Sequence, residues 1–248
     1  MKRWLTLLAL FGLVLPGVAF GQSLPTITFG IGQASDPGEV STALQILAVL
    51  TILTAAPSIL LMTTAFTRIV IVLSFARQAI GTPQAPGNQV VISLALFLTF
   101  FVMAPVFTQI NQNAIGPYMN KSIGLEAALE QAVLPMRQFM FSQVEEQTLE
   151  MMVNLSGAAQ PSTQEDVPTM TLIPAFMLSE LKRAFQMGFL IFVPFLVVDM
   201  VVASVLMSMG MMMLPPVVIS LPFKILLFVL VDGWSLLVGS LFQSFAGG

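Results

Sequence analysis

The sequence contains no cysteine and no histidine among its 248 residues. Zinc sites of the Cys/His kind, haem ligation by either residue, thiol catalysis and Ser-His triads are therefore excluded. Disulfide bonds are excluded for the same reason, whatever the compartment. The sequence also has no glycine-rich phosphate loop and no cluster of metal ligands, so we expect neither a metal nor another cofactor.

Charged residues are also scarce, at 8% of the chain against 56% hydrophobic residues, with a mean hydropathy of +0.93. Soluble domains usually carry about 25% charged residues. A core of this size cannot remove that much apolar surface from water, so the composition indicates an integral membrane protein. The 9 basic and 12 acidic residues give a net charge of −3 and no basic patch, which argues against nucleic-acid binding.

The N-terminus has the pattern of a signal peptide, predicted over residues 1–21. Lys2 and Arg3 are followed by an apolar run from Trp4 to Val14, and small residues close the segment. The run is short for a hydrocarbon core of about 30 Å, although a retained transmembrane helix is the alternative. Residues 22–39, which contain several prolines and glycines, are expected to form a flexible lead.

Two hydrophobic helical hairpins are predicted, over residues 40–110 and 169–248. In the first, a charge-free run from Val40 to Thr67 is long enough to span a bilayer, and Pro57 is expected to kink it. A loop rich in proline and glycine then precedes a second apolar segment. In the second hairpin, the stretches Leu172–Gly210 and Met211–Phe245 are separated by a Pro-Pro pair near the start of the latter.

Residues 111–168 differ from the rest of the chain, because they carry 7 acidic and 2 basic side chains. Leu125–Leu134 is expected to be helical, and Pro135 is expected to begin another helix, since proline suits the first helical turn. The segment therefore predicts a small acidic helical lobe outside the membrane. The expected fold class is all-α, with this lobe between the two membrane-associated hairpins.

The basic residues give conflicting predictions of which side of the membrane each loop faces. Arg68 and Arg77 predict that the first loop is cytoplasmic, and a cleaved signal peptide then places the acidic lobe outside. Lys182 and Arg183, however, lie on that outer side, against the positive-inside rule. The conflict suggests that some hydrophobic helices pack on protein rather than on lipid.

Ionisable residues inside the hydrophobic segments are candidates for function or for pairing, because an isolated charge is costly there. The candidates are Asp199, Lys224 and Asp232. Lys224 and Asp232 are eight residues apart and would lie on similar faces of one helix. For these residues, a structural ion pair or interhelical polar contact is favoured over a proton relay. Intramembrane aspartyl proteolysis by Asp199 and Asp232 is a third and weaker hypothesis, because such proteolysis needs two carboxyl groups in contact.

Arg68 and Arg77 have two interpretations that the sequence does not separate. They fit anchors whose charged ends reach the membrane interface, and they also fit partners for carboxylates on neighbouring chains.

Methionine is clustered in the second hairpin, around Gly210. The side chain is unbranched and soft, so it fills irregular gaps and repacks at low cost. A ring of such side chains, one set per subunit, would seal a pore and still yield to a passing chain, whereas the alternative is ordinary core packing at a helix end. Gly210 and the Pro-Pro pair favour a non-helical turn that carries the cluster: Met207, Met209, Met211, Met212 and Met213.

Two long stretches resemble the signatures of the FliP family, the flagellar export-gate proteins and their relatives in virulence injectisomes. The stretches run from Pro174 to Phe189 and from Pro194 to Met211, and both are highly specific. Arg68–Arg77, Met212–Pro216 and Leu221–Trp234 fit as well, so the resemblance covers nearly the whole mature chain. The signal peptide and the longer N-terminal lead resemble the flagellar branch.

The resemblance implies a structural pore subunit of type III secretion and no enzyme. Members form a pentamer that assembles with FliR and FliQ, within the export ring of FlhA and FlhB in the basal body. The gate sits in the bacterial inner membrane, projects towards the periplasm and conducts unfolded flagellar subunits. By resemblance, the methionine cluster with Gly210 is the constriction, and Asp199, Lys224, Asp232, Arg68 and Arg77 are structural polar contacts.

The alternative is a secondary transporter or ion channel that uses Asp199 and Lys224. It predicts solute flux from the isolated chain, whereas the pore subunit predicts a multimer without a solute cycle.

Overall fold

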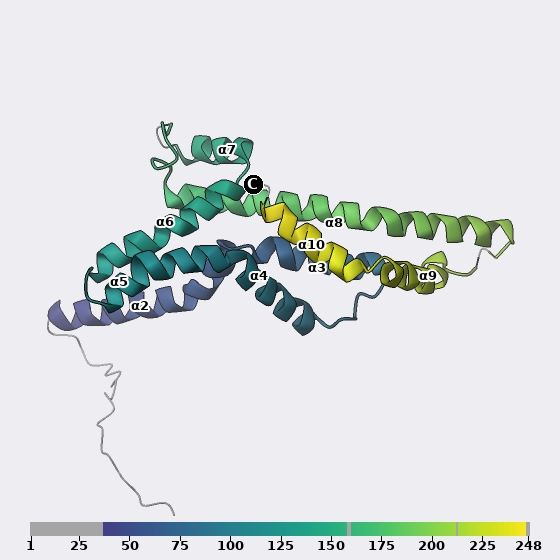
Figure 1. The fold of residues 1–248 in the computed structure, drawn as a ribbon, viewed down its shortest axis with the longest axis horizontal. Coiled ribbons are helices and arrows are strands. Elements are labelled where there is room, and N and C mark those ends of the chain that lie inside the picture. Colours follow the sequence, from purple (N-terminus) through teal and green to yellow (C-terminus); the bar gives the residue numbers. More distant parts are fainter. Residues whose placement is uncertain (1–36, 158–159, 212, 247–248) are drawn as a thin grey trace, which may run out of the picture. The chain divides into compact units, whose positions relative to one another are not determined.

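The computed structural model describes residues 37–157, 160–211 and 213–246, and in these residues it contains helices and no strand (Figure 1). The expected all-α class is confirmed. The predicted signal peptide and most of the lead lie outside the described residues. The elements are α2 (Pro37–Met62), α3 (Phe66–Ile80), α4 (Asn88–Ile110), the π-helical turn η1 (Asn111–Ile115), α5 (Gly116–Met119), α6 (Leu125–Gln143), α7 (Glu146–Ser156), α8 (Thr169–Ser208), α9 (Pro216–Leu230) and α10 (Gly233–Ala246).

The chain divides into two units, Met1–Leu50 and Thr51–Gly248. The described part of the first unit is the beginning of helix α2, which starts at Pro37 and so extends into the segment expected to be a flexible lead. All packing described below lies within the second unit.

Several helix boundaries differ from the sequence-based expectation. The run that was expected to continue to Thr67 breaks after Met62, and α3 begins at Phe66. The predicted break at Pro135 is wrong, since α6 continues through it to Gln143. Ala128 and Met140, on either side of Pro135, are both buried, so tertiary packing outweighs the one hydrogen bond that proline removes.

The second apolar segment also continues as a helix beyond Ile110, where the first hairpin was predicted to end. Helix α4 passes through the π-helical turn η1 into α5, which makes a continuous helical segment from Asn88 to Met119. The polar lobe therefore begins later than residue 111.

Helices α9 and α10 form a bent pair rather than one straight segment. They meet at 63°, where Asp232 adopts a left-handed conformation with φ 50°. Asp is among the few residues other than glycine that tolerate this region. Gly233 follows because a Cβ atom there would lie 2.3 Å from the Phe228 ring.

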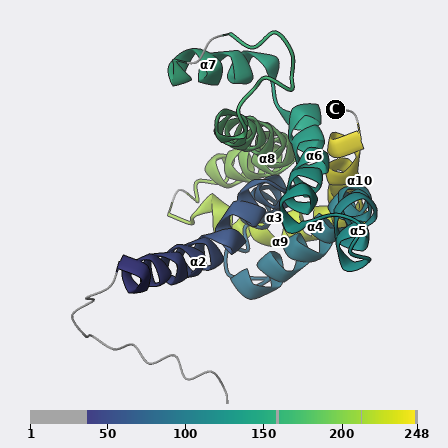
Figure 2. The same ribbon diagram turned by 90° about the vertical axis from the view of Figure 1, so that its left-hand side faces the viewer.

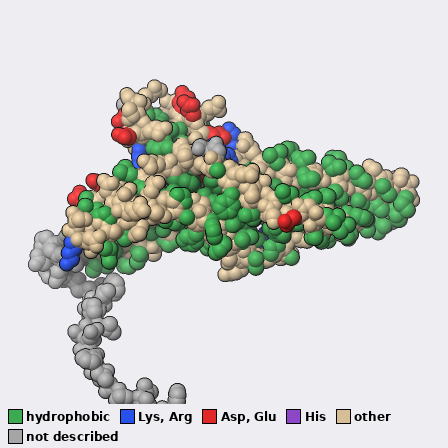
Figure 3. Space-filling model, viewed as in Figure 1, with side chains coloured by type: hydrophobic (Ala, Val, Ile, Leu, Met, Phe, Trp, Pro, Cys, Tyr) green, Lys and Arg blue, Asp and Glu red, His purple; other side chains and the backbone are tan. Residues whose placement is uncertain are grey.

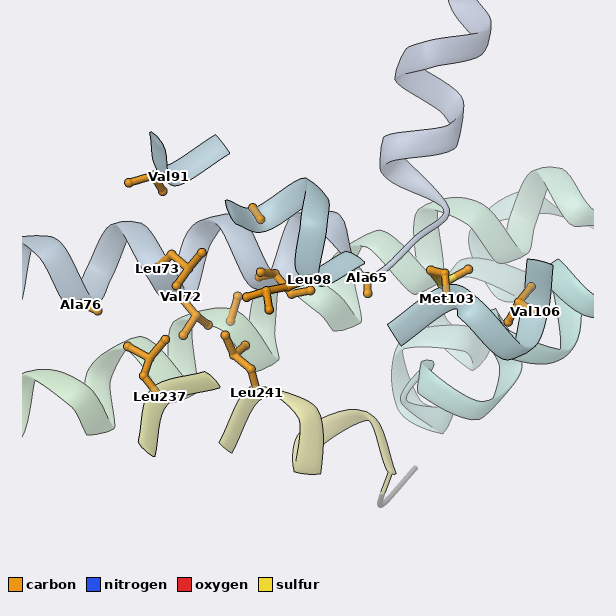
Figure 4. Close-up of a cluster of buried hydrophobic side chains, with 13 residues drawn as sticks. Ala65, Val72, Leu73, Ala76, Val91, Leu98, Met103, Val106, Leu237 and Leu241 are labelled. Atoms are coloured by element: carbon orange, nitrogen blue, oxygen red, sulfur yellow. The ribbon is translucent and has the colours of Figure 1, made fainter. Parts of the chain in front are cut away.

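The main core is built around α3. Its buried face, which includes Ile69, Val72 and Leu73, packs with side chains of α4, α8 and α10. Figure 4 shows Val72 of α3 facing Leu237 and Leu241 of α10. In a membrane protein, close packing of such side chains, rather than their removal from water, holds the helices together.

Helix α3 approaches α8 closely at one point. The Phe75 ring lies over Gly188, where a Cβ atom would be 2.4 Å away. Phe185 and Phe192, which flank Gly188 on α8, meet the same ring edge to face at centroid distances of 5.2 and 6.0 Å. A glycine between two phenylalanines thus makes the groove into which Phe75 fits.

The acidic lobe consists of α6, α7 and the loop before α8, and it packs on the N-terminal part of α8 (Figures 1 and 2). Its small core contains Met140, Val167, Leu172 and Phe176. The loop is held by local hydrogen bonds: the hydroxyl and the N–H of Thr163 donate to the Asp166 carboxylate at 2.9 and 3.0 Å and lower its pKa.

The lobe also explains the basic pair that conflicted with a simple topology. The Lys182 ammonium donates to Glu145 at 2.6 Å, and Arg183 donates to the Gln143 side chain at 3.2 Å. Both side chains are therefore engaged with the lobe, as expected for a helix that packs partly on protein.

Among the described residues, two helical segments are long and apolar enough to cross a membrane, Asn88–Met119 and Thr169–Ser208. The number rises to four if each bent helix pair is counted as one span. The membrane character indicated by the composition is therefore confirmed.

Candidate functional site

The methionine-rich segment forms the turn between α8 and α9. Helix α8 ends at Ser208, and Gly210 stands just beyond it at φ 74°. The Met211 N–H donates to the Leu206 carbonyl at 3.0 Å, and the Gly210 N–H donates to the Met207 carbonyl at 3.1 Å. This is the Schellman arrangement, in which glycine supplies the left-handed residue that ends a helix.

The methionine side chains of this turn have little to pack against in their own subunit. Met207 and Met209 are exposed, Met213 is 99% exposed, and Met211 is half-buried. Met212 lies outside the described residues. A fully exposed Met213 does not fit the core-packing alternative, so these side chains are free to contact something outside this chain.

Asp199 and Lys224 connect the two helices below this turn. The Lys224 ammonium donates to the Asp199 carboxylate at 2.6 Å, and the Ser220 hydroxyl donates to the other carboxylate oxygen. Lys224 is 6% exposed and Asp199 is 24% exposed. The pair lies within one chain and cross-links α8 to α9.

Replacing Asp199 by Asn is expected to destabilise the α8–α9 hairpin by about 2 kcal/mol, because the buried Lys224 charge loses its partner. Thermal unfolding of the purified complex in detergent would measure this as a lower midpoint. The double variant Asp199→Leu, Lys224→Met is expected to recover part of the loss, since it leaves no unpaired charge. Equal or greater loss in the double variant would contradict the ion-pair role.

Arg68 is the centre of a second polar cluster, and it is fully buried. Its Nε donates to Glu180 Oε2 at 2.9 Å, and its Nη2 donates to Glu180 Oε1. Nη1 donates to the backbone carbonyl and the hydroxyl of Ser244, both at 3.0 Å. Nη2 also donates to Gln143 Oε1 at 3.0 Å, so all five N–H groups of the guanidinium are used.

Gln143 and Phe245 complete this cluster, which we call the Arg68 hub. The Gln143 amide donates to the Phe245 carbonyl and to Ser142 Oγ, both at 3.2 Å. The Phe245 ring lies 3.9 Å from the Arg68 guanidinium carbon, in a cation–π contact. The hub therefore joins α3, α6, α8 and α10. Both earlier interpretations of Arg68 are wrong, because its carboxylate partner is Glu180 of the same chain.

Arg77 and Asp232 lack such partners in the described part of the second unit. Arg77 Nη1 donates to the neutral acceptors Pro86 O, at 3.0 Å, and Asn88 Oδ1, at 2.7 Å, while its Nε is buried without a hydrogen-bond partner. Asp232 is exposed and takes part in no ion pair between described residues. It also stands outside α9, so the expectation that it shares a helix face with Lys224 is wrong.

The residues that sequence reasoning missed are the partners: Glu180, Gln143, Ser220 and Ser244. Glu180 carried a signal, because it is a carboxylate within an otherwise apolar segment, as Arg68 is a cation within another. Gln143, Ser220 and Ser244 carried none, since polar uncharged residues are common in such helices.

Two catalytic arrangements, a metal site and a carboxyl pair of Asp199 and Asp232, are not formed in the residues that the structure describes. They contain no cluster of side chains able to hold a metal ion. The Asp199 carboxylate is bound by Lys224 and Ser220 and shares no hydrogen bond with Asp232, so a pair of carboxyl groups sharing a proton is not formed.

Comparison with known proteins identifies close relatives. The FliP family model matches residues 49–241. The chain is 56% identical over 215 residues to the flagellar biosynthetic protein FliP of Bacillus subtilis (strain 168), covering 87% of this chain and 97% of that protein. It is 52% identical to the FliP of Caulobacter vibrioides, over 95% of this chain and 87% of the relative. It is 47% identical to the FliP of Aquifex aeolicus, over 99% of this chain and 100% of the relative.

Proposed function

This chain belongs to the FliP family, and from that premise we propose that several copies of it form the wall of a pore for unfolded flagellar proteins. The relatives are named for flagellar biosynthesis, and this chain acts in the same process as a structural component of the export apparatus rather than as an enzyme. Its apolar helices place it in a membrane, which for a bacterial export gate is the inner membrane.

The single observation that carries the pore hypothesis is the exposed methionine turn at the end of a rigid hairpin. The turn is held in place by the Schellman cap and by the Asp199–Lys224–Ser220 contacts. Soft side chains on a rigid support form a seal that closes around whatever occupies the pore. Irregular backbone at membrane depth is tolerated where it lines a cavity, which agrees with a turn that faces a lumen.

The exposed apolar surface of the second unit supports assembly with other chains. Val197, Val201 and Val205 are exposed along α8, and Phe97 and Phe100 along α4. Surfaces of this kind are covered either by lipid or by other subunits. We propose that they are covered by further copies of this chain, a pentamer as in the family, and by FliR and FliQ, with FlhA and FlhB around the gate in the basal body. The gate then projects towards the periplasm.

The seal is tested by replacing Met209, Met211, Met212 and Met213 together with Ala. We expect the closed gate to leak small ions, because the shorter side chains no longer meet at the centre of the pore. Conductance across the inner membrane would measure the leak, with assembly checked by the size of the purified complex. Unchanged conductance in a correctly assembled complex would falsify the sealing role.

A change at a methionine away from the turn provides the matched control. Met170 is also exposed, but it stands at the start of α8, at the end of that helix away from the turn. Met170→Ala is expected to leave conductance at the level of the unchanged protein. A transporter that uses Asp199 and Lys224 would instead show solute flux from the isolated chain.

A further inference from the structure

Most charged residues of the described apolar helices fall into ion pairs; the exceptions are Arg183, which donates to the neutral Gln143 side chain, Arg77 and Asp232. Arg68 is paired with Glu180, Lys182 with Glu145, and Lys224 with Asp199. Within the described residues, Arg77 and Asp232 take part in no ion pair. One is a cation and the other an anion, and a charge on an apolar surface is expensive unless it is compensated.

Both residues lie beside the same small core. Ala79 and Ile80, which follow Arg77 closely, pack with Phe228 in a buried cluster, and Gly233, next to Asp232, contacts the Phe228 ring. The two charges are therefore carried by segments that meet at one level of the second unit, yet they do not bind each other.

Asp232 stands at the rim of an apolar groove. Val231 and Gly233, on either side of it, line a groove of about 400 Å³ together with Leu190, Leu227 and Leu236. Asp232 itself is exposed. Figure 3 shows how few acidic atoms interrupt the largely hydrophobic surface away from the lobe. The groove would accept an apolar helix that carries a cation beside it.

The surroundings of Arg77 complement those of Asp232, because Arg77 is a cation beside exposed apolar side chains of α4. Its guanidinium is fixed against the start of α4 by the bond to Asn88, and the next residues of α4 expose Val90 and Ile92. Only Nη1 has hydrogen-bond acceptors among the described residues, which leaves Nη2 open to a carboxylate. Arginine is well suited to such a contact because its planar fork matches a carboxylate.

We propose that Arg77 of one copy of this chain binds Asp232 of the next copy, with the start of α4 packed along the apolar groove. The two halves of the contact are different surfaces, so the interface is head-to-tail and builds a closed ring or a helical stack rather than a two-fold dimer. The inference rests on the proposed function, because it names the surface through which the subunits of the pore meet.

Charge reversal tests the pair in the full chain, produced together with its export partners. Arg77→Glu and Asp232→Lys are each expected to lower the yield of the assembled complex by about tenfold or more, since like charges then face each other. The double reversal is expected to restore most of the yield. Lysine is strained at the left-handed Asp232 position in both the single and the double variant, so this strain cancels when the two are compared. A further variant, Asp232→Asn, removes the charge with a residue that tolerates this backbone conformation.

The absence of cysteine allows a second test by cross-linking. A chain with both Arg77→Cys and Asp232→Cys, treated with a short bis-maleimide, is expected to give a ladder of linked subunits. A mixture of two chains with one substitution each is expected to give dimers only. The matched control combines Arg77→Cys with Lys121→Cys, because Lys121, like Asp232, has a left-handed backbone conformation. This control is expected to give no ladder.

The outcomes separate this interface from the proposed function. If the unchanged protein forms no multimer, the pore hypothesis fails and the interface with it. If a multimer forms but neither the reversal nor the cross-link depends on residues 77 and 232, the interface is wrong and the pore hypothesis stands. Loss of yield in Arg77→Glu alone, without rescue and with anionic lipid retained only by the unchanged protein, would assign Arg77 to lipid headgroups instead.

Discussion

Replacing Arg68 by Met is expected to prevent the protein from accumulating in the membrane. The change leaves the Glu180 carboxylate fully buried without a cation, and breaking a buried pair in this way costs about 3–5 kcal/mol. Native domains are stable by only about 5–15 kcal/mol. Arg68→Lys is expected to fail almost as badly, because an ammonium has three donors where the hub uses five. Steady-state levels and denaturant unfolding of the purified complex would measure both losses.

Two controls distinguish the buried pair from a general effect of lost charge. The double variant Arg68→Met, Glu180→Met removes both charges and is expected to be more stable than either single variant. Lys182→Met breaks an ion pair whose lysine is half exposed, and it is expected to cost less than about 1 kcal/mol. An Arg68→Met protein with normal levels and an unchanged unfolding curve would contradict the structural role of the hub.

Replacing Gly188 by Val is expected to separate α3 from α8 and to lower stability by about 1–3 kcal/mol. The added side chain begins 2.4 Å from the Phe75 ring, which is itself held between Phe185 and Phe192, so no side chain can move aside without losing contacts. The thermal unfolding midpoint measures the change. Gly239→Ala is the control, since no atom lies within 4 Å of a Cβ atom there. Partial rescue by the added change Phe75→Leu is expected, and its absence would count against steric overlap as the cause.

The sequence was sufficient to predict the class of fold, because long apolar runs and a polar insert decide it. The positions of the helix ends could be predicted less well from the sequence. Pro135 was expected to start a helix, but burial of residues on both of its sides keeps α6 continuous. The break at Asp232 was missed because aspartate gives a weak turn signal, and the close contact of Gly233 with Phe228 is a tertiary effect.

For the candidate site, sequence reasoning found the residues but not their partners. The cluster of methionines beside Gly210 and a Pro-Pro pair is a local pattern, and the turn that carries it follows from glycine and proline chemistry. Arg68 and Glu180 are 112 residues apart, and the period of a helix does not indicate which distant helix it will meet. Pairing of charges across helices is therefore knowable only from packing.

The Arg68 hub also constrains the order of events during synthesis of the protein. Ser244, which binds the guanidinium, lies 176 residues after Arg68 in the chain, and Glu180 lies 112 residues after it. These partners are synthesised long after α3, so until then the Arg68 guanidinium is solvated by water or lipid headgroups. The contacts of the Arg68 hub are therefore completed only when the last helix has been made, and a chain truncated before Ser244 lacks both acceptors of Arg68 Nη1 while keeping the Glu180 carboxylate.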